Sequence, residues 1–374
     1  MDFELTEVQA ELVGAVHKVL ERECPPALAR AVVEEGRTPE QPWKSARELG
    51  WTAISIDESH GGLGLGFEEL GLVVEEHGRF LAPGPLLATL TQLLPVLREL
   101  GSKEQRAEWL PRIAAGELTG TLAWSGATGR GLGPLPDASL RARRDGAGYR
   151  LDGSRHFVLD GDTADEIAVA ARVDEGDGCA LFCVPRGALR SERITALDAS
   201  RPLATLHFEG LQVGPERTLG EPGSSAVAFQ RALDETTVAL ALDLIGACGT
   251  LLDLSLEHAR HRHQFGQPIG AFQAIQHKCA DCLVALEKAR ATAYFAMMTI
   301  AERDPRSTLA ASMAKAAAGA AQRRICREAI QIHGGTGYTW ESDVHLFVKR
   351  AQSNAALFGT AAEHRDRIAD VLKL

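Results

Sequence analysis

The sequence predicts an α+β protein of three consecutive parts: a helical domain over residues 1–118, a small antiparallel β domain over 119–218, and a helical bundle over 219–374. Three observations support this order. Apolar residues recur at helical spacing in the first part, short apolar runs alternate with turn signals in the second, and long uninterrupted helical patterns fill the third. A chain of 374 residues is long enough for each part to bury its own core.

The composition excludes several classes of protein. The net charge is −10, from 40 basic and 50 acidic residues, so no basic surface is expected for nucleic acid or anionic lipid. The N-terminus lacks the basic and apolar regions of a signal peptide. No uninterrupted apolar stretch reaches the ~18 residues that a membrane span needs. We therefore expect a cytoplasmic protein that binds neither nucleic acid nor membrane.

The first part reads as helices with short breaks. One helical run ends at Cys24 and the two prolines after it, and its apolar positions are Phe3, Val8, Leu12, Val16 and Leu20. Further helices are expected at 42–49, 67–80 and 103–115. The glycine-rich stretch 61–66 precedes one of them, but its spacing is not G-x-G-x-x-G, which favours a tight turn over a phosphate site.

Residues 119–218 are typical of a small antiparallel barrel or sandwich. Four Asp-Gly turn signals separate short apolar or alternating runs. The expected strands cover 119–124, 149–151, 156–159, 166–171, 180–184 and 204–209. Helices then return and are long, at 227–261, 272–302 and 306–333, the last rich in alanine.

Cysteine and histidine patterns give no metal or disulfide signal. The seven cysteines are scattered, and the pair Cys279 and Cys282 lies within a helical pattern, so we expect thiols that pack as small hydrophobic groups. His258, His261 and His263 lack a neighbouring ligand in a recognised pattern. We expect them at a solvated helix end, with no metal site.

Two local sequences are not required by helix packing alone. They are RHQFGQPI at 262–269 and QIHGGTGY at 331–338. In each, a helix stops at glycines and leaves backbone N–H groups beside a cation or an amide, an arrangement suited to phosphate oxygens and the polar edges of a nucleotide. Taken alone, either segment is more simply explained as a helix C-cap.

Together these motifs resemble the acyl-CoA dehydrogenase family of flavoproteins, and the likeness extends to the glycines at 61–64 and to the α–β–α order. The resemblance implies FAD-dependent α,β-dehydrogenation of an acyl-CoA thioester. A carboxylate removes the α-proton, the β-hydrogen passes as hydride to the flavin, and a carrier flavoprotein later accepts the electrons. It also implies that each FAD receives contacts from a neighbouring subunit, through the Arg–Phe and Gln-Gly-Gly segments.

The chain departs from the family at the catalytic base. The family's Glu directly precedes Gly-Thr, where this chain has Phe358 before Gly359-Thr360. In some members the Glu lies on the first long helix of the bundle, at the position of Thr236. Glu235 is adjacent, but one residue along a helix turns a side chain by about 100°. Phe358 cannot accept a proton, and Thr236 is a very poor base.

The expected flavin pocket of this chain has changed as well. The family's T-E-x-x-A-G-S-D and aromatic-Ile-Thr-Asn-Gly segments, which hold the flavin ring, correspond here to residues 123–129 and 156–161. Leu159 stands where a hydroxyl is usual, although Phe157 keeps an aromatic face. The Arg-Asp before the catalytic loop is Lys349-Arg350.

The chain therefore keeps the segments that contact a neighbouring subunit's FAD, whereas its own flavin pocket and base have changed. This pattern indicates the non-catalytic chain of an α2β2 acyl-CoA dehydrogenase, a type known from the shortening of steroid side chains. The expected cofactor contacts are Arg262, Phe265, Gln331, Gly334, Gly335 and Thr360. Two alternatives remain open. One is a homo-oligomeric dehydrogenase whose base is Glu235, Asp243 or Glu363; the other is a non-redox scaffold with the same fold.

Overall fold

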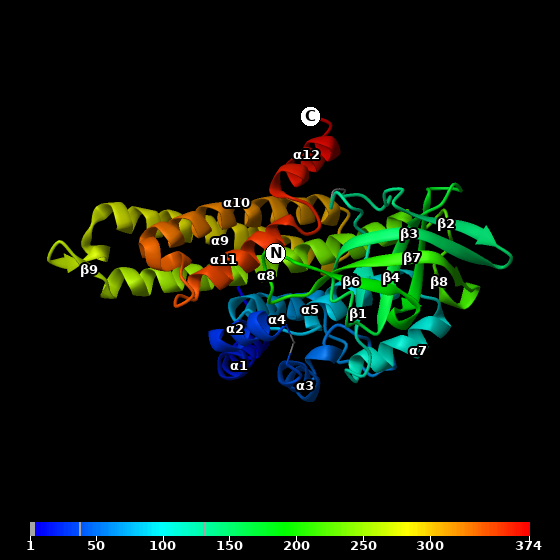
Figure 1. The fold of residues 1–374 in the computed structure, drawn as a ribbon, viewed down its shortest axis with the longest axis horizontal. Helices are drawn as coiled ribbons and strands as arrows, with labels where there is room; N and C mark the ends of the chain where they lie inside the picture. Colours follow the sequence, from blue (N-terminus) through cyan, green and yellow to red (C-terminus); the bar gives the residue numbers. More distant parts are fainter. Residues whose placement is uncertain (1–3, 37–38, 130–131) are drawn as a thin grey trace.

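The computed structural model describes residues 4–36, 39–129 and 132–374, so the predicted helix position Phe3 lies outside the described residues. Figure 1 shows an elongated molecule. The helical bundle runs along its length, the β domain lies at one end, and the N-terminal helices pack beneath the junction of the two. The predicted order of helices, β domain and helical bundle is confirmed.

The N-terminal part is helical up to Ala114. Thr6 begins the first helix with a capping box to Gln9. The stretch 61–66 is a tight turn, as predicted. Its backbone packs closely, since a Cβ on Gly62 would lie 1.8 Å from the Ile56 carbonyl oxygen. The helices are α1 (Glu7–Glu23), α2 (Pro26–Glu35), α3 (Gln41–Glu48), α4 (Phe67–Arg79), α5 (Leu86–Ala88), the π-helix η3 (Thr89–Leu93), α6 (Leu94–Leu100) and α7 (Lys103–Ala114), with 3₁₀ turns η1 (Trp51–Ala53) and η2 (Glu58–His60).

The middle part is one eight-stranded sheet in the order β6-β7-β3-β2-β4-β5-β8, with β1 paired to β4. The pairing is antiparallel except for β1–β4 and β2–β4, which are parallel. Two predicted strands, 149–151 and 156–159, form the single long strand β3. The strands are β1 (Gly120–Ala123), β2 (Leu140–Asp145), β3 (Gly148–Leu159), β4 (Glu166–Arg172), β5 (Cys179–Pro185), β6 (Arg190–Ile194), β7 (Leu203–Val213) and β8 (Thr218–Leu219).

The bundle is built around α8 (Ala226–His261), which packs against α4, α9 and α10. The β9–β10 hairpin (His263–Gln264, Gln267–Pro268) and the 3₁₀ turn η6 (Ile269–Ala271) join α8 to α9. The remaining helices are α9 (Gln273–Ala301), α10 (Ser307–His333), α11 (Val344–Ala356) and α12 (Ala361–Leu372), with the 3₁₀ turn η7 (Gly334–Tyr338) after α10.

The sequence predicts no apolar stretch long enough to span a membrane, but by length and composition α8 could cross one. Its most apolar window is 83% buried inside the protein, so its hydrophobicity matches its place in the core. All seven cysteines are buried and free, as expected of thiols that pack as small hydrophobic groups. Among the described residues no group of three His, Cys, Asp or Glu side chains could hold a metal ion.

Candidate functional site

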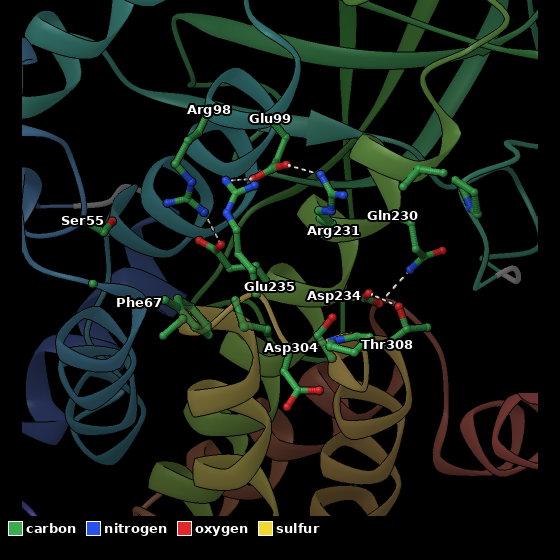
Figure 2. Close-up of a pocket in the computed structure, with 18 of the residues that line it drawn as sticks. Ser55, Phe67, Arg98, Glu99, Gln230, Arg231, Asp234, Glu235, Asp304 and Thr308 are labelled. Atoms are coloured by element: carbon green, nitrogen blue, oxygen red, sulfur yellow. Dashed lines mark hydrogen bonds and ion pairs between the residues drawn. The ribbon is translucent and has the colours of Figure 1, made fainter. Parts of the chain in front are cut away.

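A cavity of about 740 Å³ lies where the N-terminal helices meet the first turns of α8 and the α9–α10 connection (Figure 2). A cavity of this size is in the range that holds a small-molecule ligand. Apolar residues such as Phe67 and Val227 form part of the wall. The charged residues of the wall are Asp57, Arg98, Glu99, Arg231, Asp234, Glu235, Arg303 and Asp304.

Ion pairs organise the charged side of this cavity. Arg98 donates a hydrogen bond to the carboxylate of Glu235. Glu99 lies between two arginines, 3.4 Å from Arg231 and 3.0 Å from Arg303 (Figure 2). Arg231 and Arg303 are more than half exposed, so they can turn toward an entering ligand at little cost. The cavity is therefore suited to a ligand that carries polar groups.

Two polar atoms at the cavity wall are buried without a partner. Glu235 Oε1 and Ser55 Oγ have no hydrogen bond within the described residues. Asp234, by contrast, accepts hydrogen bonds from Gln230 at 2.7 Å and from Thr308 at 2.5 Å. Because a buried polar atom without a partner is costly, Glu235 and Ser55 are the wall residues best placed to bind a ligand.

Glu235 and its neighbour Thr236 point in different directions, as their helical spacing predicts. The Thr236 hydroxyl donates to the Thr91 carbonyl of η3 at 2.6 Å and lies close to the Ala232 carbonyl at 3.0 Å. Burial raises the pKa of Glu235, and the charge of Arg98 offsets part of that rise. Glu235 is thus a buried, partly paired carboxylate beside the cavity, whereas Thr236 is fully engaged.

The other two base candidates are occupied by structural contacts. Asp243 is fully buried and accepts from Arg201 at 2.5 Å and from Asn354. Burial alone would raise the pKa of Asp243, but Arg201 and the neighbouring His77, whose Nδ1 lies 3.5 Å from Asp243 Oδ1, hold that pKa well below its usual range. Glu363 accepts from the backbone N–H of Thr360 at 2.9 Å as part of the α12 capping box.

Phe358 lies in the junction between the β domain and the α11–α12 loop. Its ring stacks on Trp124, with ring centroids 5.4 Å apart and planes 13° from parallel. Trp124 directly follows β1, in the segment where the resemblance predicts flavin contacts. Leu159 is also buried, while Phe157 is 36% exposed. We call the contact between Trp124 and Phe358 the aromatic seam.

Two buried titratable side chains hold the loop that carries Phe358. Lys315 Nζ donates to the carbonyls of Asn354, Leu357 and Gly359, at 2.8, 2.6 and 2.9 Å. His364 Nε2 donates to the Phe358 carbonyl at 2.9 Å. Burial lowers the pKa of Lys315 to about 7. Burial and the charge of Lys315 lower the pKa of His364 to about 4.

The two glycine-terminated motifs lie together at the other end of the bundle. His258, just before the first motif, stacks on His333 of the second motif, with ring centroids 4.4 Å apart. Phe265, in the β9–β10 hairpin, is 92% exposed. Within the described part of the chain, the Arg262 guanidinium makes no hydrogen bond or ion pair. We call this region the bundle tip; its exposed members are Arg262, Phe265, Gln331, Gly334 and Gly335.

The bundle tip lies far from the aromatic seam of the same chain. Figure 1 shows the β9 hairpin at one end of the long axis and the β domain at the other. α8 alone has 36 residues, which corresponds to about 54 Å at about 1.5 Å per residue. Thr360, the remaining expected cofactor contact, is exposed beside the seam, with its hydroxyl bound to Glu363 in the α12 cap. The structure therefore does not bring all the predicted cofactor contacts to one place.

Backbone strain marks three phenylalanines in these motifs. Phe157, Phe265 and Phe358 have φ angles of 56°, 55° and 54°, a conformation that bulky residues rarely adopt. Such a conformation costs on the order of 1–3 kcal/mol and persists only where the surroundings enforce it. Strained residues of this kind concentrate at functional sites.

Sequence reasoning missed the cavity residues Arg98, Glu99 and Ser55 and the loop anchor Lys315. A signal existed on α8, where polar residues at 230, 231, 234 and 235 follow helical spacing within an otherwise apolar helix. Lys315 lies within an alanine-rich helix and gave no signal of its burial.

Comparison with known proteins agrees with this architecture. Residues 6–117 match the family Acyl-CoA dehydrogenase, N-terminal domain, and residues 226–373 match Acyl-CoA dehydrogenase, C-terminal domain. The mitochondrial short-chain specific acyl-CoA dehydrogenase of Bos taurus is 30% identical, over 97% of this chain and 89% of that protein. The chain belongs to the acyl-CoA dehydrogenase family, oxidoreductases that act on CH–CH bonds.

Two similar solved structures are complexes of paired chains. The ChsE4–ChsE5 complex from Mycobacterium tuberculosis has a TM-score of 0.91 and 28% identity, over 100% of this chain and 99% of that chain. The Tcur3481–Tcur3483 steroid ACAD has a TM-score of 0.88 and 28% identity, over 98% of each chain.

Family membership indicates FAD, and the two candidate regions differ in how well they fit it. At the bundle tip, the unpaired Arg262 and the glycines fit a diphosphate and a nucleotide edge. At the seam, Trp124 lies in a segment where the resemblance predicts contacts to the flavin ring. Among the described residues, the stacked rings of Trp124 and Phe358 offer no side-chain hydrogen-bond donor except the buried Trp124 Nε1. The residues of the seam do not fit the flavin.

Proposed function

We propose that this chain is the non-catalytic subunit of a heteromeric, FAD-dependent acyl-CoA dehydrogenase and that it contributes the bundle tip to the FAD of a homologous catalytic chain. The observation that carries this proposal is the contrast between the two regions. The bundle tip is exposed and Arg262 has no side-chain partner among the described residues, whereas Trp124 and Phe358 stack on each other at the seam. Similarity to the ChsE4–ChsE5 complex supports a partner chain.

The proposed reaction is α,β-dehydrogenation of an acyl-CoA thioester. FAD, when bound, accepts the hydride from the β-carbon, and the catalytic chain supplies the carboxylate that removes the α-proton. An electron-transferring flavoprotein then takes up the electrons. This acceptor is supported by similarity to a solved structure described as the electron transferring flavoprotein of Acidaminococcus fermentans, with a TM-score of 0.89 and 27% identity. The steroid ACAD neighbour supports a bulky acyl group.

Co-expression with a homologous catalytic chain tests this function. We expect the two chains to copurify as an α2β2 complex that contains flavin, while the chain purified alone contains little. In the complex, Arg262→Ala should reduce FAD content and leave assembly intact, and Arg260→Ala, an exposed neighbour on α8, serves as the matched control. Unchanged FAD occupancy in the Arg262→Ala complex would give Arg262 a purely structural role.

A second candidate function is a homo-oligomeric dehydrogenase in which Glu235 is the base. The observation in its favour is that Glu235 borders the cavity, with one buried carboxylate oxygen that has no partner in the described part of the chain. Single-turnover bleaching of the flavin by an acyl-CoA distinguishes the two. A collapse of the bleaching rate in Glu235→Gln, in correctly assembled and flavin-loaded protein, would assign the chemistry to this chain. Absence of flavin with every partner tested would instead favour a non-redox scaffold.

A further inference from the structure

The aromatic seam closes the space between two segments that are far apart in sequence. Trp124 follows β1 in the β domain, and Phe358 lies between α11 and α12 of the bundle. Trp124 is 5% exposed and Phe358 is 9% exposed. Beside them, a Cβ on Gly359 would lie 2.0 Å from Leu132 Cδ2, so the backbone of the loop also packs directly against the β domain.

A third ring does not fit between these two. Contacting carbon atoms lie about 3.5 Å apart, so a planar ring inserted between two parallel rings needs them about 7 Å apart. The observed centroids are 5.4 Å apart. A flavin could enter the seam only if one of the rings moved away.

The backbones that carry the two rings are held on both sides, so a ring could leave the seam only by a change of rotamer. Lys315 binds carbonyls before and after Phe358, and His364 binds the Phe358 carbonyl itself. On the β-domain side, the backbone N–H of His156 donates to the carbonyl of Ser125, the residue after Trp124, at 2.9 Å.

From this geometry we propose that Trp124 and Phe358 permanently fill the flavin seat of this chain, so that the ring pair itself, rather than the missing polar contacts alone, excludes flavin. The inference rests on the proposed function in one respect: it explains why the chain contributes to a partner's FAD without holding its own. It adds that removing the rings reopens the seat, whereas restoring a hydroxyl at Leu159 does not.

FAD titration of the purified full-length chain tests this proposal. Unbound FAD is separated by gel filtration, and flavin absorbance measures binding. The opened variants are Phe358→Leu, which removes the ring and keeps an apolar side chain, and the double variant Trp124→Ala with Phe358→Leu. The matched controls are Phe358→Tyr, which keeps the stacked ring, and Leu159→Thr, which restores the hydroxyl and leaves the rings in place.

We expect the double variant to bind FAD at least tenfold more tightly than the wild-type chain, with Phe358→Leu between them and both controls unchanged. Thermal melts identify any variant that fails to fold, and Phe358→Leu, the milder change, then decides. Equal FAD affinity in the wild-type chain and the folded opened variants would overturn the proposal, as would a gain in Leu159→Thr alone. Because these titrations do not involve Arg262 or a partner, they can fail while the contribution to a partner's FAD stands, and the reverse also holds.

Discussion

The bundle tip and the aromatic seam of this chain differ in the exposure and pairing of their side chains. At the tip, Arg262 and Phe265 are exposed, and Arg262 has no partner among the described residues. At the seam, Phe358 is buried, stacked and held through its backbone by Lys315 and His364. Exposed and unpaired groups are available to another molecule, whereas buried and satisfied groups are not. Under the proposed function, this contrast means that the chain offers the bundle tip to a neighbour while its own flavin seat is closed.

The largest expected effect is on the rate of flavin bleaching. It distinguishes the base of the catalytic chain from Glu235 of this chain. Replacing the catalytic chain's carboxylate should lower the rate of flavin bleaching by an acyl-CoA by about 10²–10⁴-fold, the usual contribution of a general base. Glu235→Gln in this chain should leave that rate within a few-fold, because Glu235 pairs with Arg98 at the wall of a cavity that does not include Phe358. Stopped-flow absorbance on matched complexes checks both. Equal losses from the two substitutions would remove the contrast between the chains.

Lys315→Met should be strongly destabilising, by about 3 kcal/mol or more, because it leaves three buried carbonyls without their donor. Denaturant unfolding of the two proteins measures this difference. Lys278→Met is a suitable control, since Lys278 pairs with Glu328 and is about one third exposed. A loss no larger than that of the control would show that the loop is not held by Lys315.

The stability difference between the wild-type protein and Lys315→Met should also depend on pH. The pKa of Lys315 is about 7 in the folded chain, against the ordinary value of about 10.4 in the unfolded chain. Between these values the unfolded state binds more protons, so Lys315 adds stability as the pH rises above 7. The stability difference between wild type and Lys315→Met should therefore grow from pH 7 to pH 9, by at most about 1.4 kcal/mol per pH unit. A difference that shrinks with rising pH would contradict the lowered pKa.

Arg262→Ala should weaken FAD binding in the assembled complex by about tenfold to a hundredfold, because a hydrogen bond to a charged group contributes about 1.5–3 kcal/mol. Equilibrium dialysis of FAD from the complex measures the change. Phe265→Ala, on the same hairpin, should have a smaller effect, since the aromatic contact carries no charge. A larger loss from Phe265→Ala than from Arg262→Ala would indicate that the tip binds by apolar contact.

Much of the fold could be predicted from the sequence, because its signals are local. The long helices at 227–261 and 306–333 carry their periodicity within themselves, and their ends agree with α8 and α10 within one residue. β2 and β6 were missed because most of their residues are exposed and polar, which leaves no apolar pattern to read. Two expected strands form the single strand β3 because both pair with β7 across a register shift. Such pairing is not a local property of the sequence.

The site could be predicted only where it depends on motifs. Arg262 and Gly334 stand in recognisable segments, and the structure brings those segments together at one end of the bundle. The cavity pair Arg98 and Glu235 is separated by 137 residues, so only the fold reveals it. The stacking of Trp124 on Phe358 also joins two distant segments. Phe358 could be placed from the sequence at the position of the family's base, but its stacking on Trp124 could not be predicted.

The most direct test of the account is the flavin content of the chain purified alone and purified with a homologous catalytic partner, measured by absorbance and by FAD released on denaturation. The account predicts little or no FAD in the chain alone and one FAD for each pair of unlike chains in the complex. Stoichiometric FAD bound to the chain alone, with Trp124 and Phe358 unchanged, would contradict it.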